Sequence, residues 1–459
     1  MLFSVLNNAT SGLRTTQALI DTASRNIANA STDGYHRKEQ VSTSVAHGGV
    51  KPSVVQRVTN DVLTQQARKS SAESAYADLL NKSVSGIDRL FGDPAAEVSL
   101  PSRLSQLGEA FQTLATDPTR PLSRTQVISA ADTLADTLRA TFQAIHQEAL
   151  KQQNAIAADV DAANNLIREV ASINKQVPQL LATGQDTSDL IDQRDRAIEK
   201  LSQYLEVTGF EDSTGVFQLY TKDNKLLATQ APQLLSIPSP GVVAVGNIPP
   251  SPANAVWKPG GIIGARTDLA NAVLPKYKTM LDDVAGRLAE NFTAIGIELF
   301  NDGGAVPFDP LDPAVTTDFA GRIRVNDAVR GNTDLLWGPL PTPIGDLTAI
   351  NQARDLLKPD TPLGIPFAGA SEIEVSSSLG RAMNKILATV ANDKQTAQAD
   401  YDLHSTAYER SRELLSQETG VNIDDELARI IFLQNSYSAS ARVVSATQKM
   451  LDELMQVTR

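Results

Sequence analysis

Apolar residues recur at alternating three- and four-residue steps near both ends of the chain. This spacing is typical of a helix that packs along another helix in a coiled-coil seam. We therefore predict one long helix at each end, and we expect the two helices to pair. The first series is Leu6, Ala9, Leu13, Thr16, Ile20, Ala23, Ile27 and Ala30, and the second is Leu427, Ile430, Gln434, Tyr437, Ala441, Val444, Gln448, Leu451 and Met455.

A long helical segment is predicted in the first half of the chain. Residues Leu122 to Val177 contain neither Gly nor Pro, which predicts one long helix or two stacked helices. The apolar spacing in the second half of this segment implies a partner helix. The predicted partner begins near Asp186, which can cap it, and Asp192 and Arg196 are spaced for an i,i+4 ion pair.

The periodicity changes after Phe210. The stretch "GVFQLYTKDNKLL" alternates around a polar turn, which predicts a hairpin in a small β unit that ends near residues 258–261. Prolines also gather in two segments, with seven from Pro232 to Pro259 and nine from Pro307 to Pro366, so these segments are not helical bundles. Helix returns near Ala265 and again after the second segment, with a break at Gly420.

These patterns predict a multidomain, mainly α protein with paired terminal helices, a middle helical bundle and small β-rich outer inserts. The order is helices, β insert, helix, second insert, helices, so both chain ends close the same part of the molecule. The predicted domains are an inner terminal-helix assembly domain (1–60 plus 405–459), a middle helical domain (61–205 plus 265–300 plus 371–404), and an outer β-rich domain or two small inserts (206–264 plus 301–370).

Composition narrows the classes of partner. The 459 residues include 41 Lys and Arg against 53 Asp and Glu, a net charge of −12, which argues against a nucleic-acid partner. There is no cysteine, so disulfides and thiolate metal sites are excluded. We expect no membrane span, because no apolar run is long enough, and no cleaved signal peptide, because the first charge is Arg14.

No pattern of catalytic or metal-binding residues emerges. The four histidines are scattered, and none has the spacing of a zinc site. "SINK", Ser172 to Lys175, lacks the K-T-G motif that accompanies S-x-x-K in acyl-transfer enzymes. "FNDGG" lacks the ligand spacing of an EF-hand loop. We therefore expect no catalytic residue, no metal, no cofactor and no enzymatic activity.

The last helix carries few charges on any side. Between Ile430 and Gln448 the only charged residue is Arg442, and the others are apolar, small or uncharged polar residues. A helix with one side in water normally shows charges there. This composition predicts contacts on all sides, with neighbouring copies of the chain as well as with the partner helix. The alternative is a buried core helix of an ordinary globular domain.

Both chain ends resemble known signatures. "SGLRTTQALIDTASRNIANASTDGYHRK" closely resembles the N-terminal signature of flagellar rod, hook and hook-associated proteins, and "GVNIDDELARIIFLQNSYSASARVVSATQKMLDELMQV" resembles their C-terminal signature. Asp33 stands where the family usually has proline. Three further segments, "LIDQRDRAIEKLS", "GGIIGARTDL" and "FAGRIRVND", are similar to members at the junction of hook and filament. The N-terminal matches are Ser11, Gly12, Leu13, Gln17, Asp21, Ser24, Asn26, Ile27, Ala28, Asn29, Thr32, Gly34 and Tyr35.

The resemblance implies a structural adaptor subunit that polymerises through its terminal helices to form the junction between hook and filament. It implies a homo-oligomeric ring of copies of the chain, contacts with the hook protein and the second junction protein, and a dedicated export chaperone at the C-terminal helix. It further implies an extracellular location, reached unfolded through the flagellar type III channel. Neither a nucleic acid nor a membrane is an expected partner.

The candidate site is an assembly interface on the terminal helices. Gly34 can adopt the positive φ that ends a helix, and Tyr35 can anchor the emerging chain against a neighbouring subunit. The alternative is an ordinary helix C-cap with a buried Tyr. The predicted interface residues are Leu6, Ala9, Leu13, Ile20, Ile27, Asn29, Gly34, Tyr35, Leu427, Ile430, Gln434, Tyr437, Ala441, Arg442, Val444 and Leu451.

Two other functions stay open at this point. One is another axial flagellar protein, either the second junction protein or a flagellin-like protein, although flagellins lack the "NIAN…GY" turn. The other is a secreted adhesin or hydrolase on a helical stalk. The latter requires a polar constellation in the inserts, and residues 301–370 contain acids but no histidine.

Overall fold

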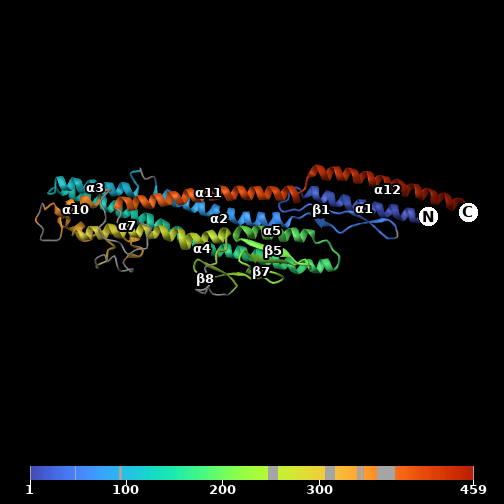
Figure 1. Ribbon diagram of the computed structural model, residues 1–459, viewed down its shortest axis with the longest axis horizontal. Coiled ribbons are helices and arrows are strands. Elements are labelled where there is room, and N and C mark those ends of the chain that lie inside the picture. Colours follow the sequence, from blue (N-terminus) through green and yellow to red (C-terminus); the bar gives the residue numbers. More distant parts are fainter. Residues whose placement is uncertain are drawn as a thin grey trace.

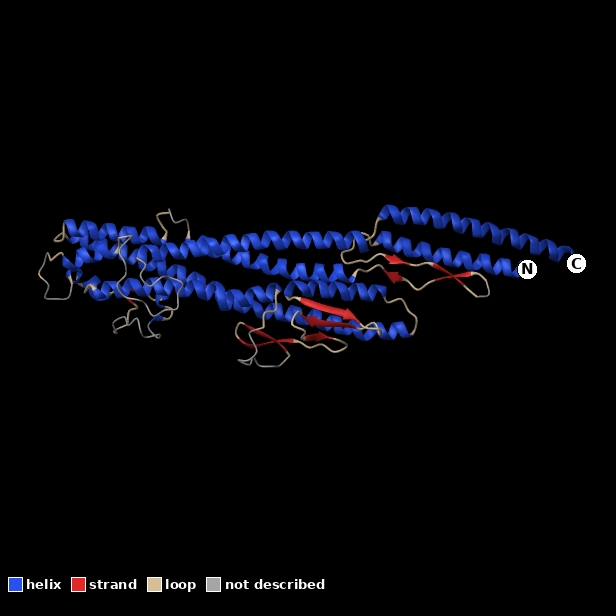
Figure 2. Ribbon diagram, in the orientation of Figure 1, coloured by secondary structure: helices blue, strands red, loops and turns tan. Residues whose placement is uncertain are grey.

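The molecule is long and narrow, with both chain ends at the same tip (Figure 1). The computed structural model describes residues 2–46, 48–92, 96–246, 257–304, 316–338, 343, 346–358 and 378–457. Helices run along the long axis, and the strands form small sheets on their flank (Figure 2). The predicted mainly α fold is confirmed.

The two terminal helices pack side by side. They are α1 (Leu2–Ala28) and α12 (Ile423–Val457), and their pairing confirms the expectation from the seam pattern. Residues 29–60, here called the connecting segment, fold back along α1. Two antiparallel strand pairs form within it, β1 with β4 and β2 with β3. The strands are β1 (Lys38–Glu39), β2 (Ser42–Ser44), β3 (Val50–Pro52) and β4 (Gln56–Arg57).

Two long helices carry the chain to and from the far end. Helix α2 (Asp61–Phe91) begins after the N-cap Asn60, whose side chain accepts a 3.1 Å hydrogen bond from Leu63 N. It packs along α11 (Leu379–Thr419), which returns to the joint with the terminal helices (Figure 1). The predicted break at Gly420 is confirmed, because α11 ends at Thr419 and α12 starts at Ile423.

The long central segment is one helix. Helix α4 (Pro121–Ala182) has 62 residues, which corresponds to a length of about 93 Å. It continues through Pro178, at which the predicted segment stopped. Helix α5 (Ser188–Tyr204) packs on α4, so the predicted partner helix is confirmed. A shorter helix, α3 (Leu100–Thr116), packs on the other half of α4.

The first insert is a β unit against α4. Strands β5 (Val207–Glu211), β6 (Phe217–Thr221) and β7 (Leu226–Ala228) form an antiparallel sheet, and β8 (Leu235–Ser239) pairs with β9 (Val242–Val245). The predicted hairpin is therefore present as β6 and β7, with Asn224 at φ 58° in its turn. Asn174 of α4 supports the sheet by accepting a 3.0 Å hydrogen bond from Phe217 N.

The chain then returns to helix and fills the far end. Helices α6 (Gly261–Asp268) and α7 (Leu274–Ala294) are joined by the π-helix Leu269–Val273. The described part of the second insert has one strand pair, β10 (Phe300–Asn301) with β11 (Arg324–Val325), and otherwise short helices that pack into the bundle core. The rest of that insert lies outside the described residues. The short helices are Phe319–Gly321, α9 (Asp327–Gly331), Thr333–Trp337 and α10 (Thr348–Leu356).

The buried apolar side chains form two clusters. One lies at the far end, among α3, α4, α7, α11 and the second insert, and the other lies between α4, α5 and the first insert. Over the described ranges, neither cluster includes a side chain from α1, the connecting segment or α12. The domain boundaries given above stay a prediction.

Candidate assembly site

The predicted seam of α1 lies in the α1–α12 pair. Leu6, Ala9, Leu13, Ile20 and Ile27 are all half-buried. Small residues allow the helices to approach closely, since a Cβ placed on Gly12 would meet Ser440 Oγ at 3.5 Å. These five predicted interface residues therefore already pack within one chain.

The predicted residues of α12 divide into two groups. Ile430, Ala441, Val444 and Leu451 are half-buried, on the side that also buries Leu433 and Thr447. The other predicted residues, Leu427, Gln434, Tyr437 and Arg442, are exposed. The structure thus separates positions that hold α12 on α1 from positions that point into solvent.

Large apolar side chains stand exposed on the outer face of α12. The exposed fraction is 60% for Ile431 and 70% for Phe432. Exposed large apolar side chains on a helix that is already paired indicate an interaction site, because water disfavours apolar surface. We call the set on the side away from α1 the outer face of α12: Leu427, Ile431, Phe432, Val443 and Met450.

Asn26 ties the terminal helices to the connecting segment. It is fully buried, and its Nδ2 donates to Lys38 O at 2.9 Å and to Glu426 Oε1 at 2.8 Å. Its Oδ1 accepts from Lys38 N at 3.0 Å and from Tyr35 OH at 3.0 Å. All hydrogen-bonding positions of the amide are thus used, as a buried polar group requires. One side chain holds α1, α12 and β1 together.

Gly34 and Tyr35 have roles that differ from a helix cap. Helix α1 ends at Ala28, six residues before Gly34, so the predicted cap at Gly34 is wrong. Gly34 does have a positive φ of 69°, and a Cβ there would lie 2.5 Å from Arg196 Cγ, so the turn needs glycine for close approach as well. Burial, with Asp192 and Asp189 nearby, raises the pKa of Tyr35 to about 12.

Tyr35 is anchored inside the chain, on Asn26, with Lys38 Nζ 4.9 Å from the centre of its ring. Asn29, the remaining predicted residue, donates from Nδ2 to Arg25 O at 2.9 Å just after α1. Both residues therefore have contacts within one chain, and whether either also touches a neighbouring subunit stays a prediction.

A buried ion network joins the connecting segment to α5. Asp192, with a side chain only 2% exposed, forms an ion pair with Arg57, whose Nε lies 2.8 Å from Asp192 Oδ1, and the same oxygen lies 3.2 Å from His36 Nδ1. Lys38 Nζ contacts Asp189 and lies 3.6 Å from Asp192 Oδ2. The predicted pair between Asp192 and Arg196 is wrong. Lys38 and Arg57 of the connecting segment neutralise the Asp192 carboxylate instead, because a buried charge needs close partners.

The network extends to α2 through Asp195. Arg68 of α2 donates to Asp195 Oδ1 at 3.0 Å, and Arg57 donates to its other oxygen. Burial raises the pKa of Asp195, but the Arg57, Arg68 and Arg194 guanidiniums outweigh it and hold the pKa at about 2. The carboxylate therefore stays charged at any physiological pH.

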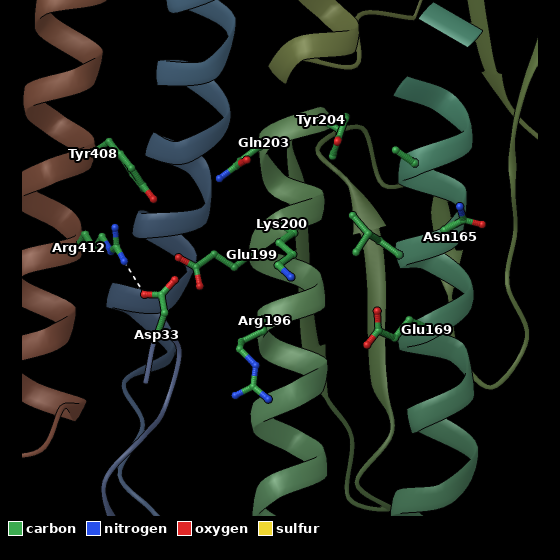
Figure 3. A pocket seen from close by; sticks show the side chains of 12 residues that line it. Asp33, Asn165, Glu169, Arg196, Glu199, Lys200, Gln203, Tyr204, Tyr408 and Arg412 are labelled. Atoms are coloured by element: carbon green, nitrogen blue, oxygen red, sulfur yellow. Dashed lines mark hydrogen bonds and ion pairs between the residues drawn. The ribbon is translucent and has the colours of Figure 1, made fainter. Parts of the chain in front are cut away.

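A cleft opens beside this network, between α11, α5 and α4 (Figure 3). Its volume is about 620 Å³, and at its edge Asp33 pairs with Arg412 of α11. Burial and the nearby Asp33 raise the pKa of Glu199. In the part of the chain that the structure describes, no group of three or more His, Asp or Glu side chains is placed to hold a metal ion.

The sequence did not predict the ion pairs that join the α5 carboxylates to Lys38, Arg57 and Arg68. Their signal was present, because Asp189, Asp192 and Asp195 follow at three-residue steps and so share one side of the helix. A row of acids on a helix that also packs on α4 indicates basic partners on a second element.

Comparisons with known proteins decide the family. Residues 84–304 match the family described as flagellar hook-associated protein FlgK helical domain, residues 416–457 match flagellar basal body rod FlgEFG protein C-terminal, and residues 6–36 match flagella basal body rod protein. Flagellar hook-associated protein 1 of Salmonella typhimurium is 23% identical over 552 residues, covering 99% of this chain and 100% of the relative. The chain belongs to the flagellar hook-associated protein 1 family.

Flagellar hook-associated protein 1 from Escherichia coli strain K12 is 30% identical to this chain over 249 residues. That alignment spans 51% of this chain and 45% of the relative. A solved structure, that of the flagellar hook junction protein FlgK from Burkholderia pseudomallei, is 22% identical and covers 53% of this chain and 44% of that chain, with a TM-score of 0.44.

In this hook-associated protein 1 family member, each of the three family matches covers a distinct part of the structure. The two terminal matches fall on α1 with its turn and on α12, and the central match runs from α2 to β10. The resemblance drawn from the sequence is confirmed. None of the helices that the structure describes is long and apolar enough to cross a membrane.

Proposed function

We propose that this chain is a non-enzymatic structural subunit that polymerises through its terminal helices into a ring at the junction between the flagellar hook and filament. The observation that carries the proposal is the outer face of α12, where large apolar side chains remain in solvent although α12 is already paired with α1. Burial of such a surface by a neighbour is favourable by roughly 25 cal/mol per Å² of apolar area.

The predicted interface residues then take two roles. The half-buried positions of α1 and α12 hold the helix pair, and the exposed positions, Leu427, Gln434, Tyr437 and Arg442, contact adjacent copies. The scarcity of charge on α12 suits such burial, since a neighbour that covers this helix has few ions to desolvate. The same surface, in the unassembled chain, is the one that we assign to an export chaperone.

Other axial proteins of the flagellum, the hook protein and the second junction protein, are the proposed neighbours beyond the ring. The location that we propose is extracellular, with export through the flagellar channel. The family membership supports this placement.

Deletion of residues 421–459 in the strain that carries this chain tests the proposal. Lost swimming, with unassembled filament protein in the medium, is the expected result. The medium is also assayed for the truncated chain, so that failed export can be separated from failed assembly. Normal filaments with the truncated chain would contradict the proposal.

A further inference from the structure

The terminal part of the molecule, α1 with the connecting segment and α12, meets the middle helices without a common apolar core. The two buried clusters, in the ranges described, draw on none of its side chains. Helix α12 packs on α1, and α1 packs on α12, β1 and β3. The orientation of the terminal part on the middle helices must therefore depend on other contacts.

The chain crosses between the two parts at residues 58–60 and 420–422, and both crossings meet at Arg37. Its N–H donates to Thr419 O at 2.8 Å, at the end of α11, and its carbonyl accepts from Val58 N at 2.9 Å, just before α2. Two crossings that touch the same residue define a pivot rather than a broad attachment.

The turn next to this pivot is not closely packed on the middle helices. A cavity of about 470 Å³ lies between residues 30–36 of the turn and the helices α2, α5 and α11. Around it the contacts are charged, and the pair of Asp33 with Arg412 spans the edge of the adjoining cleft (Figure 3). That pair is exposed on both sides, so it contributes little to the orientation.

The buried charges lie beside the pivot. The Lys38 and Asp192 side chains are 1% and 2% exposed, and Arg57 and His36 complete the shell of Asp192. All three basic residues belong to the terminal part, whereas Asp192 belongs to α5. Removal of one partner from a buried ionic cluster leaves unpaired charge, which strongly disfavours the arrangement.

We propose that Asp192 is a positioning residue that latches the terminal helices in one orientation on the middle helices. Without its carboxylate, the terminal part turns about Arg37 while α1, α12 and β1 stay together through Asn26, which does not contact Asp192. The consequence for assembly rests on the proposed function: the latched orientation presents the outer face of α12 to the next copy. The latch itself is a property of the isolated chain.

The absence of cysteine allows a direct test by pulsed electron paramagnetic resonance on the full chain. Nitroxide labels on Ser172→Cys in α4 and Ser445→Cys in α12 report the orientation, since both side chains are exposed. Labels on Ser24→Cys and Ser445→Cys report the α1–α12 pair. The variants are Asp192→Ala and the double variant Lys38→Gln with Asp192→Asn, which keeps the volume and leaves less unpaired charge. Asp161→Ala, at an exposed position of α4, is the matched control.

We expect a narrow distance distribution for the 172–445 pair in the parent and in Asp161→Ala. In both latch variants its width should rise at least about twofold, with the 24–445 distribution unchanged. An unchanged 172–445 width in the double variant would overturn the latch. Equal broadening of the 24–445 pair would overturn it too, since Asp192 would then maintain the helix pair itself.

The polymerisation of the same variants separates this inference from the proposed function. Broadened 172–445 distances together with loss of incorporation into flagella support both. Broadened distances with normal incorporation would leave the latch established in the free chain but overturn its link to assembly. A parent chain that never incorporates, with narrow distances, would instead contradict the proposed function alone.

Discussion

Asn26 of α1 donates a 2.8 Å hydrogen bond to the carboxylate of Glu426 in α12, although the two residues are 400 positions apart in the chain. Both side chains are buried, at 0% and 3% exposure. The bond makes the two ends of the chain one structural unit. It also places the first turn of α12 at the connecting segment, because the same amide holds the Lys38 backbone.

Substitution Asn26→Ala should weaken the terminal part by at least about 2 kcal/mol, because Glu426 and the Lys38 backbone lose their buried partner. Hydrogen exchange of α1 and α12 measures this loss locally, whereas α4 should keep its protection. Asn29→Ala is the matched control, since the side-chain hydrogen bonds of Asn29 are exposed and their loss should cost less than about 1 kcal/mol. Equal protection in the two variants would show that the Asn26 network adds no stability.

Gly34→Ala should destabilise the turn through both backbone and contact. Alanine at φ 69° costs about 1 kcal/mol, and its Cβ would force Arg196 to move, at about 1 kcal/mol more. Gly184→Ala isolates the first effect, because Gly184 has φ 72° and an added Cβ there would meet no atom within 4 Å. Hydrogen exchange around each substituted turn should show the larger loss of protection for Gly34→Ala. If both variants lose the same protection, the contact with Arg196 is unimportant.

Acid should weaken the joint between the terminal part and α5 through Asp195. Its pKa is about 2 in the folded chain against 3.8 for the free carboxyl, so its contribution is fully present above about pH 4 and is lost as the pH falls toward 2. The pH-dependent part amounts to about 2 kcal/mol.

The difference in unfolding free energy between the parent and Asp195→Asn, followed by hydrogen exchange of β1 and β4, should therefore shrink between pH 4 and pH 2. Asp161→Asn, on the exposed side of α4, is the control, because exposed carboxylates contribute little. A difference that stays constant over this range would show that the three arginines do not hold the Asp195 charge.

The periodicity of apolar residues was sufficient to predict where the helices lie in the sequence, but not which side of α12 is buried. The three-four spacing predicted α1 and α12, and the segment from Leu122 to Val177, which lacks Gly and Pro, predicted α4. These signals are readable because a helix that buries one side carries apolar residues along that side. In α12, apolar and small residues surround the whole helix, so several stripes fit equally. The predicted stripe included Tyr437, whereas Leu433 and Thr447 are the residues buried there.

The ion network could not be derived from local spacing. Asp192 and Arg196 satisfy the i,i+4 rule, but such a pair is worth only a few tenths of a kcal/mol on a solvated helix. Burial of Asp192 against the connecting segment outweighs that preference. The partners Lys38 and Arg57 come from strands far earlier in the chain, and only the tertiary fold brings them to α5.

The most direct test of the central claim is incorporation of the Ile431→Asp variant into flagella of cells that lack the parent chain. Ile431 is 60% exposed, so the purified variant should melt like the parent, yet a charge on the outer face of α12 should prevent assembly. Leu122→Asp makes the same kind of change at a residue that is 53% exposed on α4, and it should incorporate. Incorporation of Ile431→Asp at the parental level would contradict the assignment of this face to assembly.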